Sequence, residues 1–175
     1  MTHLLLSLLV LLGSSTETEK SRSAWWLTAS FAPKGKEIEG LPVRSLNDKW
    51  TAAMALQEEM LPPEARAVGE SVSEHSGALN ALIDLDGDDL PEKAIVGVYR
   101  GVSGEMGRFL LILRLQGNRW QKKAMFLQPG AAGFSVLFLQ ENRLVWSTCM
   151  ECDSGCTVVA TTGKWKLECE SCCDD

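Results

Sequence analysis

From residue 78 onward the chain alternates between short apolar runs and turn residues, and this regular pattern constrains the fold more than any other feature. The runs are separated by pairs typical of turns, such as Gly117-Asn118, Pro129-Gly130 and Thr162-Gly163. No helical segments alternate with the runs, so the pattern predicts an antiparallel β-meander or sandwich and not a parallel sheet. The predicted strands span residues 78–85, 93–100, 108–115, 119–127, 134–139, 144–148, 157–160 and 164–167.

One run, from Phe109 to Leu113, is apolar without interruption, so we expect a central strand covered on both faces. The cover for one face is expected from a helix that begins at Ser45, has Asp48 in capping-box spacing and ends at Pro62-Pro63. The predicted fold class is therefore mainly β (α+β), with one covering N-terminal helix. The apolar face of that helix comprises Leu46, Trp50, Met54 and Leu61.

The length of 175 residues fits a single domain preceded by an export signal. Residues 4–12 are apolar apart from Ser7, and small residues follow them, which is typical of a signal peptide and too short for a membrane span. The alternative is a short buried helix at a cytosolic N-terminus. We predict a signal peptide over 1–15, a flexible segment over 16–44 and one β-rich domain over 45–175, in a periplasmic or secreted protein without a transmembrane segment after signal removal.

Composition narrows the classes of partner. The net charge of −6 makes nucleic acid an unsuitable partner, although residues 108–123 carry five basic residues and no acidic one. With 45% hydrophobic residues the chain can build a substantial core. We therefore expect a protein partner. The oligomeric state is not specified by the sequence.

An acidic loop separates the first two predicted strands. Residues 84–92 read Asp-Leu-Asp-Gly-Asp-Asp-Leu-Pro-Glu. Alternating carboxylates at Asp84, Asp86 and Asp88 can turn toward one point, which suits a hard cation with oxygen ligands. The alternative is a hairpin turn that binds no metal, because Asp-Gly is a common turn signal between strands.

The loop and the strand after it resemble the calcium loop of FG-GAP and VCBS-type repeats, which reads D-x-D-G-D-G-x-x-D. The resemblance covers residues 81–98 at most, and Asp89 stands where the repeats have glycine. The motif occurs once, which excludes a propeller of such repeats. The resemblance implies Ca²⁺ bound by the side chains of Asp84, Asp86, Asp88 and Glu92 and by the backbone carbonyl of Leu90.

All six cysteines lie at the C-terminal end, at Cys149, Cys152, Cys156, Cys169, Cys172 and Cys173. The two C-x-x-C pairs that begin at Cys149 and Cys169 have the spacing of a zinc ribbon, so Zn²⁺ is an option if the thiols are reduced. Export into an oxidising compartment favours disulfides instead. The sequence does not choose among the 15 connectivities that six cysteines allow.

Few residues suit catalysis. His75 is the one histidine outside the predicted signal peptide, it lies in a polar stretch, and the sequence has no G-x-S-x-G motif. We therefore predict a protein that is not an enzyme. The glycine-rich turn at 101–107 has the composition to present Ser103, Glu105 and Met106 to a partner, the alternative being an ordinary flexible turn.

These features favour an exported binding protein, in particular an inhibitor or immunity protein against a cell-envelope hydrolase. Small size, export, acidity and a fold stiffened by cysteine pairs support this hypothesis. A rival hypothesis is a calcium- or zinc-stabilised structural module of a secreted assembly. A third is an enzyme whose site the sequence does not reveal.

Overall fold

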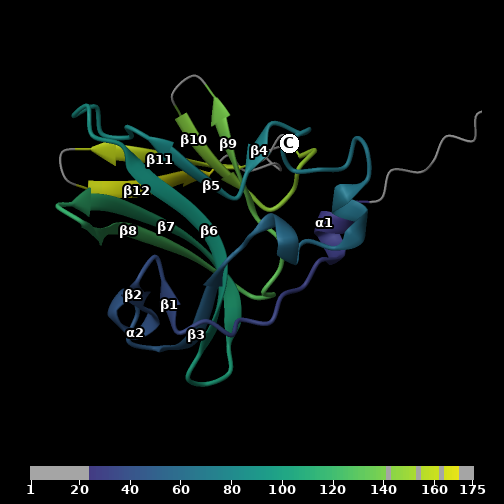
Figure 1. The fold of residues 1–175 in the computed structure, drawn as a ribbon, viewed down its shortest axis with the longest axis horizontal. Coiled ribbons are helices and arrows are strands. Elements are labelled where there is room, and N and C mark those ends of the chain that lie inside the picture. The colour runs from purple at the N-terminus through teal and green to yellow at the C-terminus, as the bar shows by residue number, and fades with distance from the viewer. Residues whose placement is uncertain (1–23, 141–142, 153–154, 162–163, 170–175) are drawn as a thin grey trace, which may run out of the picture.

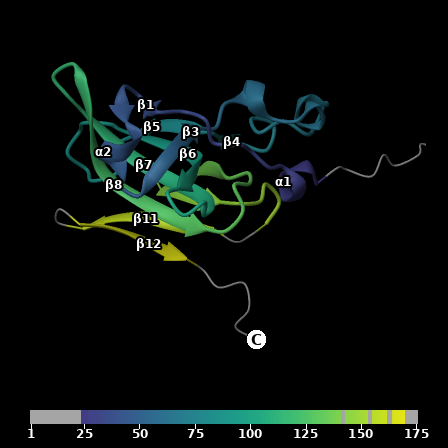
Figure 2. The same ribbon diagram turned by 90° about the horizontal axis from the view of Figure 1, so that it is seen from below.

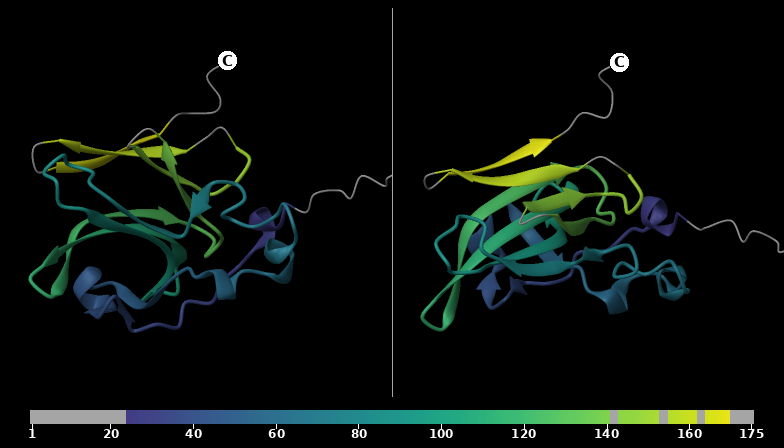
Figure 3. Two further views of the ribbon diagram at one scale, coloured as in Figure 1. Left: turned by 45° about the horizontal axis from the view of Figure 1, so that its top comes forward. Right: turned by 90° about the horizontal axis from the view of Figure 1, so that it is seen from above.

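The structure, a computed structural model, describes residues 24–140, 143–152, 155–161 and 164–169. The predicted signal peptide lies outside the described residues. Two antiparallel sheets pack face to face, as the two layers in Figure 3 show, and this confirms the mainly β prediction. The helical turns are α1 (Trp25–Thr28), α2 (Val43–Leu46), η1 (Glu58–Met60) and η2 (Pro63–Arg66).

The first sheet, called the central sheet, has the order β3-β6-β7-β8, with β5 also paired to β6 (Figure 1). Strand β5 pairs with the first half of β6 and β3 with the second half, so both lie along the same edge of that strand. The runs expected over 93–100, 108–115 and 119–127 form β6 (Glu92–Gly101), β7 (Met106–Gln116) and β8 (Arg119–Pro129), and part of the run expected over 78–85 forms β5 (Asn80–Ile83). The sheet also contains β3 (Trp50–Ala55), where no strand was predicted.

The second sheet, called the outer sheet, has the order β12-β11-β10-β9-β4. Its four longer strands also agree with the predicted runs. A separate pair, β1 (Glu37–Ile38) and β2 (Leu41–Pro42), lies in the N-terminal part. The outer strands are β4 (Gly77–Ala78), β9 (Val136–Gln140), β10 (Arg143–Ser147), β11 (Cys156–Thr161) and β12 (Lys164–Cys169).

Strands β6 and β7 contribute to two cores, one on each face of the central sheet. Residues at even positions pack toward the outer sheet, and residues at odd positions pack toward β1, β2 and α2. Figure 2 shows the central sheet between the β11–β12 hairpin and this N-terminal segment. The apolar run from Phe109 to Leu113 is fully buried, which confirms the prediction of a strand covered on both faces.

The predicted helix from Ser45 to Pro62 is wrong. The chain forms only short helical turns here, at Val43–Leu46 and Glu58–Met60. Ser45 lies inside the first of them and donates a hydrogen bond from its hydroxyl to the carbonyl of Pro42 (2.7 Å). The segment that follows forms β3, because it completes the backbone hydrogen bonds of β6 and places Trp50 and Ala53 in the second core. Pairing with a distant strand thus overrides the helix preference of an Ala- and Met-rich sequence.

The expected flexible segment is also corrected in its described part. Trp25 and Trp26 are buried in the core between the sheets, and Ile38 and Val43 are buried in the other core. Residues 24–44 therefore belong to the folded domain. In the part of the chain that the structure describes, none of the helices is long and apolar enough to cross a membrane.

Candidate functional site

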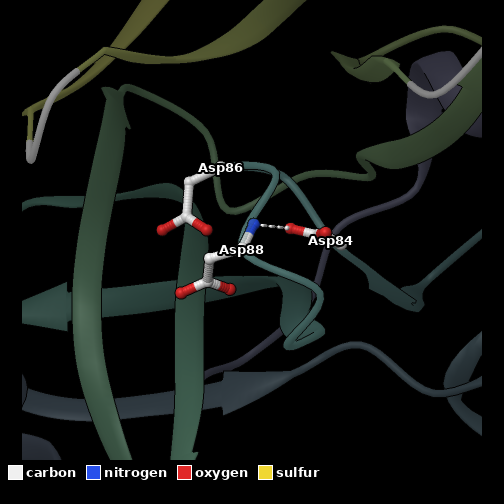
Figure 4. A group of neighbouring side chains, drawn as sticks. All are labelled: Asp84, Asp86 and Asp88. Atoms are coloured by element: carbon white, nitrogen blue, oxygen red, sulfur yellow. Dashed lines mark hydrogen bonds between the residues drawn. The ribbon is translucent and has the colours of Figure 1, made fainter.

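The acidic loop forms the turn between β5 and β6, and Asp84 holds it in shape. The Asp84 carboxylate accepts hydrogen bonds from the backbone N–H groups of Gly87 (2.8 Å), Asp88 (3.2 Å) and Asp89 (2.8 Å). Figure 4 shows the bond from the Asp88 nitrogen, with the Asp86 carboxylate lying nearby. Gly87 and Asp89 adopt the left-handed conformation with φ of 76° and 65°, which Asp tolerates better than most residues.

Arg114 supplies the positive charge at this loop. It lies on β7 directly opposite Glu92 of β6 in the strand register. Its guanidinium donates hydrogen bonds to Asp86 (2.8 Å), to Asp88 (2.6 Å) and to Glu92. The Glu92 side chain is 0% exposed, and its other oxygen accepts the N–H of Leu85 at 3.0 Å. One guanidinium therefore ties three carboxylates to the central sheet.

The pKa values at the loop follow from these contacts. Burial acts to raise the pKa of Asp88, but the hydrogen bonds from the Leu90 N–H and from Arg114 outweigh it and hold that pKa below its ordinary value. The hydrogen bond to Asp86, followed by that to Asp88, raises the pKa of the Arg114 guanidinium. Both groups are therefore charged at neutral pH.

Three of the five predicted calcium ligands come together in the structure. Asp84, Asp86 and Asp88 each offer an oxygen atom, and these atoms lie within 4.8 Å of one another. This spacing suits a cation with oxygen ligands. Glu92 is different, because its side chain is 0% exposed and its two oxygens bind the Arg114 guanidinium and the N–H of Leu85. A metal ion at this loop would therefore compete with Arg114 for Asp86 and Asp88.

Sequence reasoning missed Arg114. The available signal was a single arginine that directly follows the uninterrupted apolar run from Phe109 to Leu113. A charge placed there, on a strand expected to be buried on both faces, needs an acidic partner. The register that brings Glu92 opposite Arg114 completes the site, and the sequence did not specify that register.

Four of the six cysteines form disulfides, which confirms the disulfide prediction for them. Cys149 pairs with Cys152, and Cys156 pairs with Cys169 across the β11–β12 hairpin. Cys172 and Cys173 lie outside the described residues. Two disulfides fit an extracellular or otherwise oxidising compartment. Sulfurs joined in a disulfide do not act as thiolate ligands, so these four cysteines do not form a zinc ribbon while oxidised.

The turn between β6 and β7 contains the three predicted partner-contact residues. Ser103 is exposed, and Met106 is 37% exposed. Glu105 is exposed as well, but its carboxylate accepts the backbone N–H of Ser103 at 3.0 Å. The turn is also closed by the Gly101 N–H to the Glu105 carbonyl (2.8 Å) and fixed to the chain before β3 by the Val102 N–H to the Lys49 carbonyl (2.9 Å).

His75 has structural contacts. Its Nε2 lies 3.0 Å from the carbonyl oxygen of Gly69, and its ring packs edge-on against Trp26 with centroids 6.0 Å apart. The neighbouring Glu74 carboxylate accepts the backbone N–H groups of Gly69 and Ser71 (3.1 Å each). These bonds organise the loop over α1, so we assign His75 to the packing of that loop.

Comparison with known proteins found no matching family model, no matching curated protein and no matching solved structure.

Proposed function

We propose that this chain is an exported, non-catalytic binding protein that recognises a protein partner through the β6–β7 turn. The proposed partner is a hydrolase of the cell envelope, which the chain inhibits in the periplasm or outside the cell. The observation that supports this proposal is a hydrogen-bonded turn, at the end of the central sheet (Figure 1), that exposes two aliphatic side chains. Val102 is 58% exposed and Met106 is 37% exposed.

The hydrogen bonds within the turn favour tight binding. Because the Glu105 carboxylate and the Lys49 carbonyl already fix the backbone, less conformational entropy is lost when a partner binds. Methionine is common at the centre of interfaces, and its flexible side chain fills irregular pockets. A convex turn of this kind has the shape to enter a concave active site, which is the commonest form of an enzyme's substrate pocket.

Capture of a partner from an envelope extract tests this proposal. The wild-type chain should retain a hydrolase at a stoichiometric ratio and reduce its activity. Met106→Asp and Val102→Asp should weaken that complex by about 2 kcal/mol each, because each places a charge at the centre of the interface. Val68→Asp is the matched control, since Val68 is a 97% exposed aliphatic residue on a different loop. Equal retention by all three variants would contradict the proposal.

A second candidate function is a calcium-stabilised structural module, and the mutual approach of Asp84, Asp86 and Asp88 favours it. We propose a dissociation constant of about 10⁻⁴–10⁻³ M, the range of extracellular modules. Calorimetry with CaCl₂ tests it. Asp86→Ala should abolish most of the binding heat, while Asp48→Ala, which changes an exposed aspartate elsewhere, should leave it unchanged. If the wild type gives no heat, the loop is a hairpin turn neutralised by Arg114 alone.

A further inference from the structure

Arg108 carries a positive charge and is partly buried. It lies on β7, and its side chain is on the face that packs toward the outer sheet, the same face as Leu110 and Ile112. The guanidinium lies against Gly133, where a Cβ atom would be 3.1 Å from its central carbon. Its Nε is buried and has no hydrogen-bond partner among the residues that the structure describes.

Within the described residues, no carboxylate forms an ion pair with Arg108. Burial lowers the pKa of its guanidinium, with no acidic neighbour acting in the opposite direction. A charge that is partly removed from water and has no opposite charge nearby is unfavourable for the isolated protein. An anion supplied from outside would relieve this cost.

A second arginine lies beside it. Arg108 is paired with Val98 of β6, and Arg100 is two residues further along β6, so it lies diagonally from Arg108 on the same face. Arg100 is exposed and is paired with Met106, the residue of the β6–β7 turn at the start of β7. The two arginines are therefore continuous with the surface proposed to bind the partner.

We infer that Arg108 and Arg100 together bind carboxylate groups of the protein partner. This inference rests on the proposed function, which supplies the identity of the partner. It adds the chemical group that the partner presents to the two arginines. Guanidinium groups bind carboxylates through paired N–H donors, and such charge-assisted bonds are stronger where water is partly excluded. The hydrolase class that fits is one whose active-site cleft holds acidic side chains, as in enzymes that cleave glycosidic bonds with two carboxylates.

The test uses the whole oxidised chain and a defined probe in place of the partner. The ¹⁵N-labelled Nε–H signals of the arginine side chains are followed by NMR during titration with a capped hexaglutamate peptide. Parallel titrations use a capped hexaglutamine peptide and inorganic phosphate. We expect saturable shifts of the Arg108 signal with hexaglutamate, weaker binding of phosphate and no response to hexaglutamine.

Two variants and one control assign the site. Arg108→Gln should reduce hexaglutamate affinity about tenfold, and Arg100→Gln, at an exposed position where folding is not at risk, should reduce it by a smaller factor. Arg119→Gln is the matched control, because Arg119 is an exposed arginine at the far end of β8. Equal losses in all three variants would indicate attraction by overall charge and overturn the inference. Tighter binding of phosphate than of hexaglutamate would overturn the assignment to carboxylates.

The outcome is separable from that of the proposed function. Hexaglutamate binding that depends on Arg108 supports the anion site even if no hydrolase is captured from the extract. Capture of a hydrolase through Met106, with no response of Arg108 to hexaglutamate, would overturn the anion site and leave the binding function in place.

Discussion

Arg108 and Arg114 lie on the same strand, on the same face, and have opposite electrostatic surroundings. Both occupy even-numbered positions on β7, so both side chains point toward the outer sheet. The Arg114 guanidinium binds Asp86, Asp88 and Glu92. No ion pair to Arg108 is found in the part of the chain that the structure describes.

The difference indicates that the charge of Arg114, and not that of Arg108, stabilises the fold. The acidic residues of the β5–β6 turn are placed so that Arg114 neutralises them and fixes the turn to the sheet. Among the described residues no carboxylate is paired with Arg108 in this way, although Arg108 is partly buried. A charge retained at a cost to stability is typical of a residue that acts on another molecule. Four predictions test this contrast, in order of decreasing expected effect.

Arg114→Met should cause the largest loss of stability. It leaves the fully buried Glu92 without its cation and removes the charge that separates Asp86 and Asp88. Breaking a buried pair by removing one partner costs about 3–5 kcal/mol. Urea unfolding measures the loss, and Arg119→Met, at an exposed site, should change the free energy of unfolding by less than about 0.5 kcal/mol. A loss below about 1 kcal/mol in Arg114→Met would mean that the ion pairs contribute little.

The second prediction concerns pH. The folded-state pKa of Asp88 is below its ordinary value of 3.8, so its contribution is complete above the unfolded pKa and is lost as the pH falls through the folded pKa. Wild-type stability should therefore decline from about pH 5 toward about pH 2. Arg114→Met removes part of the cause, so the difference in unfolding free energy between the two proteins should narrow as acid is added. A constant difference would contradict the role of Arg114 in holding Asp88 ionised.

The contrast between the two arginines also shows which features the sequence can predict and which depend on the pairing of distant strands. The strands from β5 to β12 were predictable because each carries a local apolar pattern bounded by turn residues. Strand β3 was not, since its Ala-rich sequence reads as helix and its extended form depends on pairing with β6, more than forty residues away. The disulfide partners depend likewise on which strands are neighbours, as for Cys156 and Cys169.

For the acidic loop, the sequence correctly predicted that three aspartates lie close together, but it did not identify Arg114 as the cation beside them. The hydrogen bonds from Arg114 reach 22, 26 and 28 residues back along the chain, to Glu92, Asp88 and Asp86. Such contacts are fixed by strand register, and register depends on how both cores are packed. The lack of an ion pair to Arg108 among the described residues could not be predicted either. It depends on which side chains surround Arg108 in three dimensions.

Arg108→Met should leave stability unchanged or increase it by about 1 kcal/mol, in contrast to the same change at Arg114. Methionine has a similar length, and an apolar side chain suits a position between Val98 and Leu110. Thermal and urea unfolding of the two variants, measured together, give the comparison. If Arg108→Met were destabilised as much as Arg114→Met, Arg108 would have to be part of the internal charge balance, and the contrast would fail.

The last prediction gives Arg108 an acidic partner within the protein, as Arg114 already has. Gln128 on β8 is paired directly with Arg108 and is exposed, so Gln128→Glu places a carboxylate next to the Arg108 guanidinium. A cross-strand pair of opposite charges contributes roughly 0.2–1 kcal/mol, so we expect a gain of about 0.5 kcal/mol. Gln121 has the same exposed position opposite Arg114, which makes Gln121→Glu the matched control. Because Arg114 already has three carboxylates, that control should give no gain, and a fourth acid nearby should lower stability slightly.

The same pair of variants distinguishes an internal partner from an external one. The new carboxylate of Gln128→Glu should compete with hexaglutamate for Arg108, so the affinity for hexaglutamate should fall about tenfold. Gln121→Glu should leave that affinity unchanged. The stabilising effect of Gln128→Glu should also disappear when Arg108→Met is combined with it, which a double-mutant cycle measures directly. Equal gains from Gln128→Glu and Gln121→Glu would mean that the two arginines are equally short of negative charge. The difference in their surroundings would then have no energetic consequence, and the reason for assigning Arg108 to an external carboxylate would be removed.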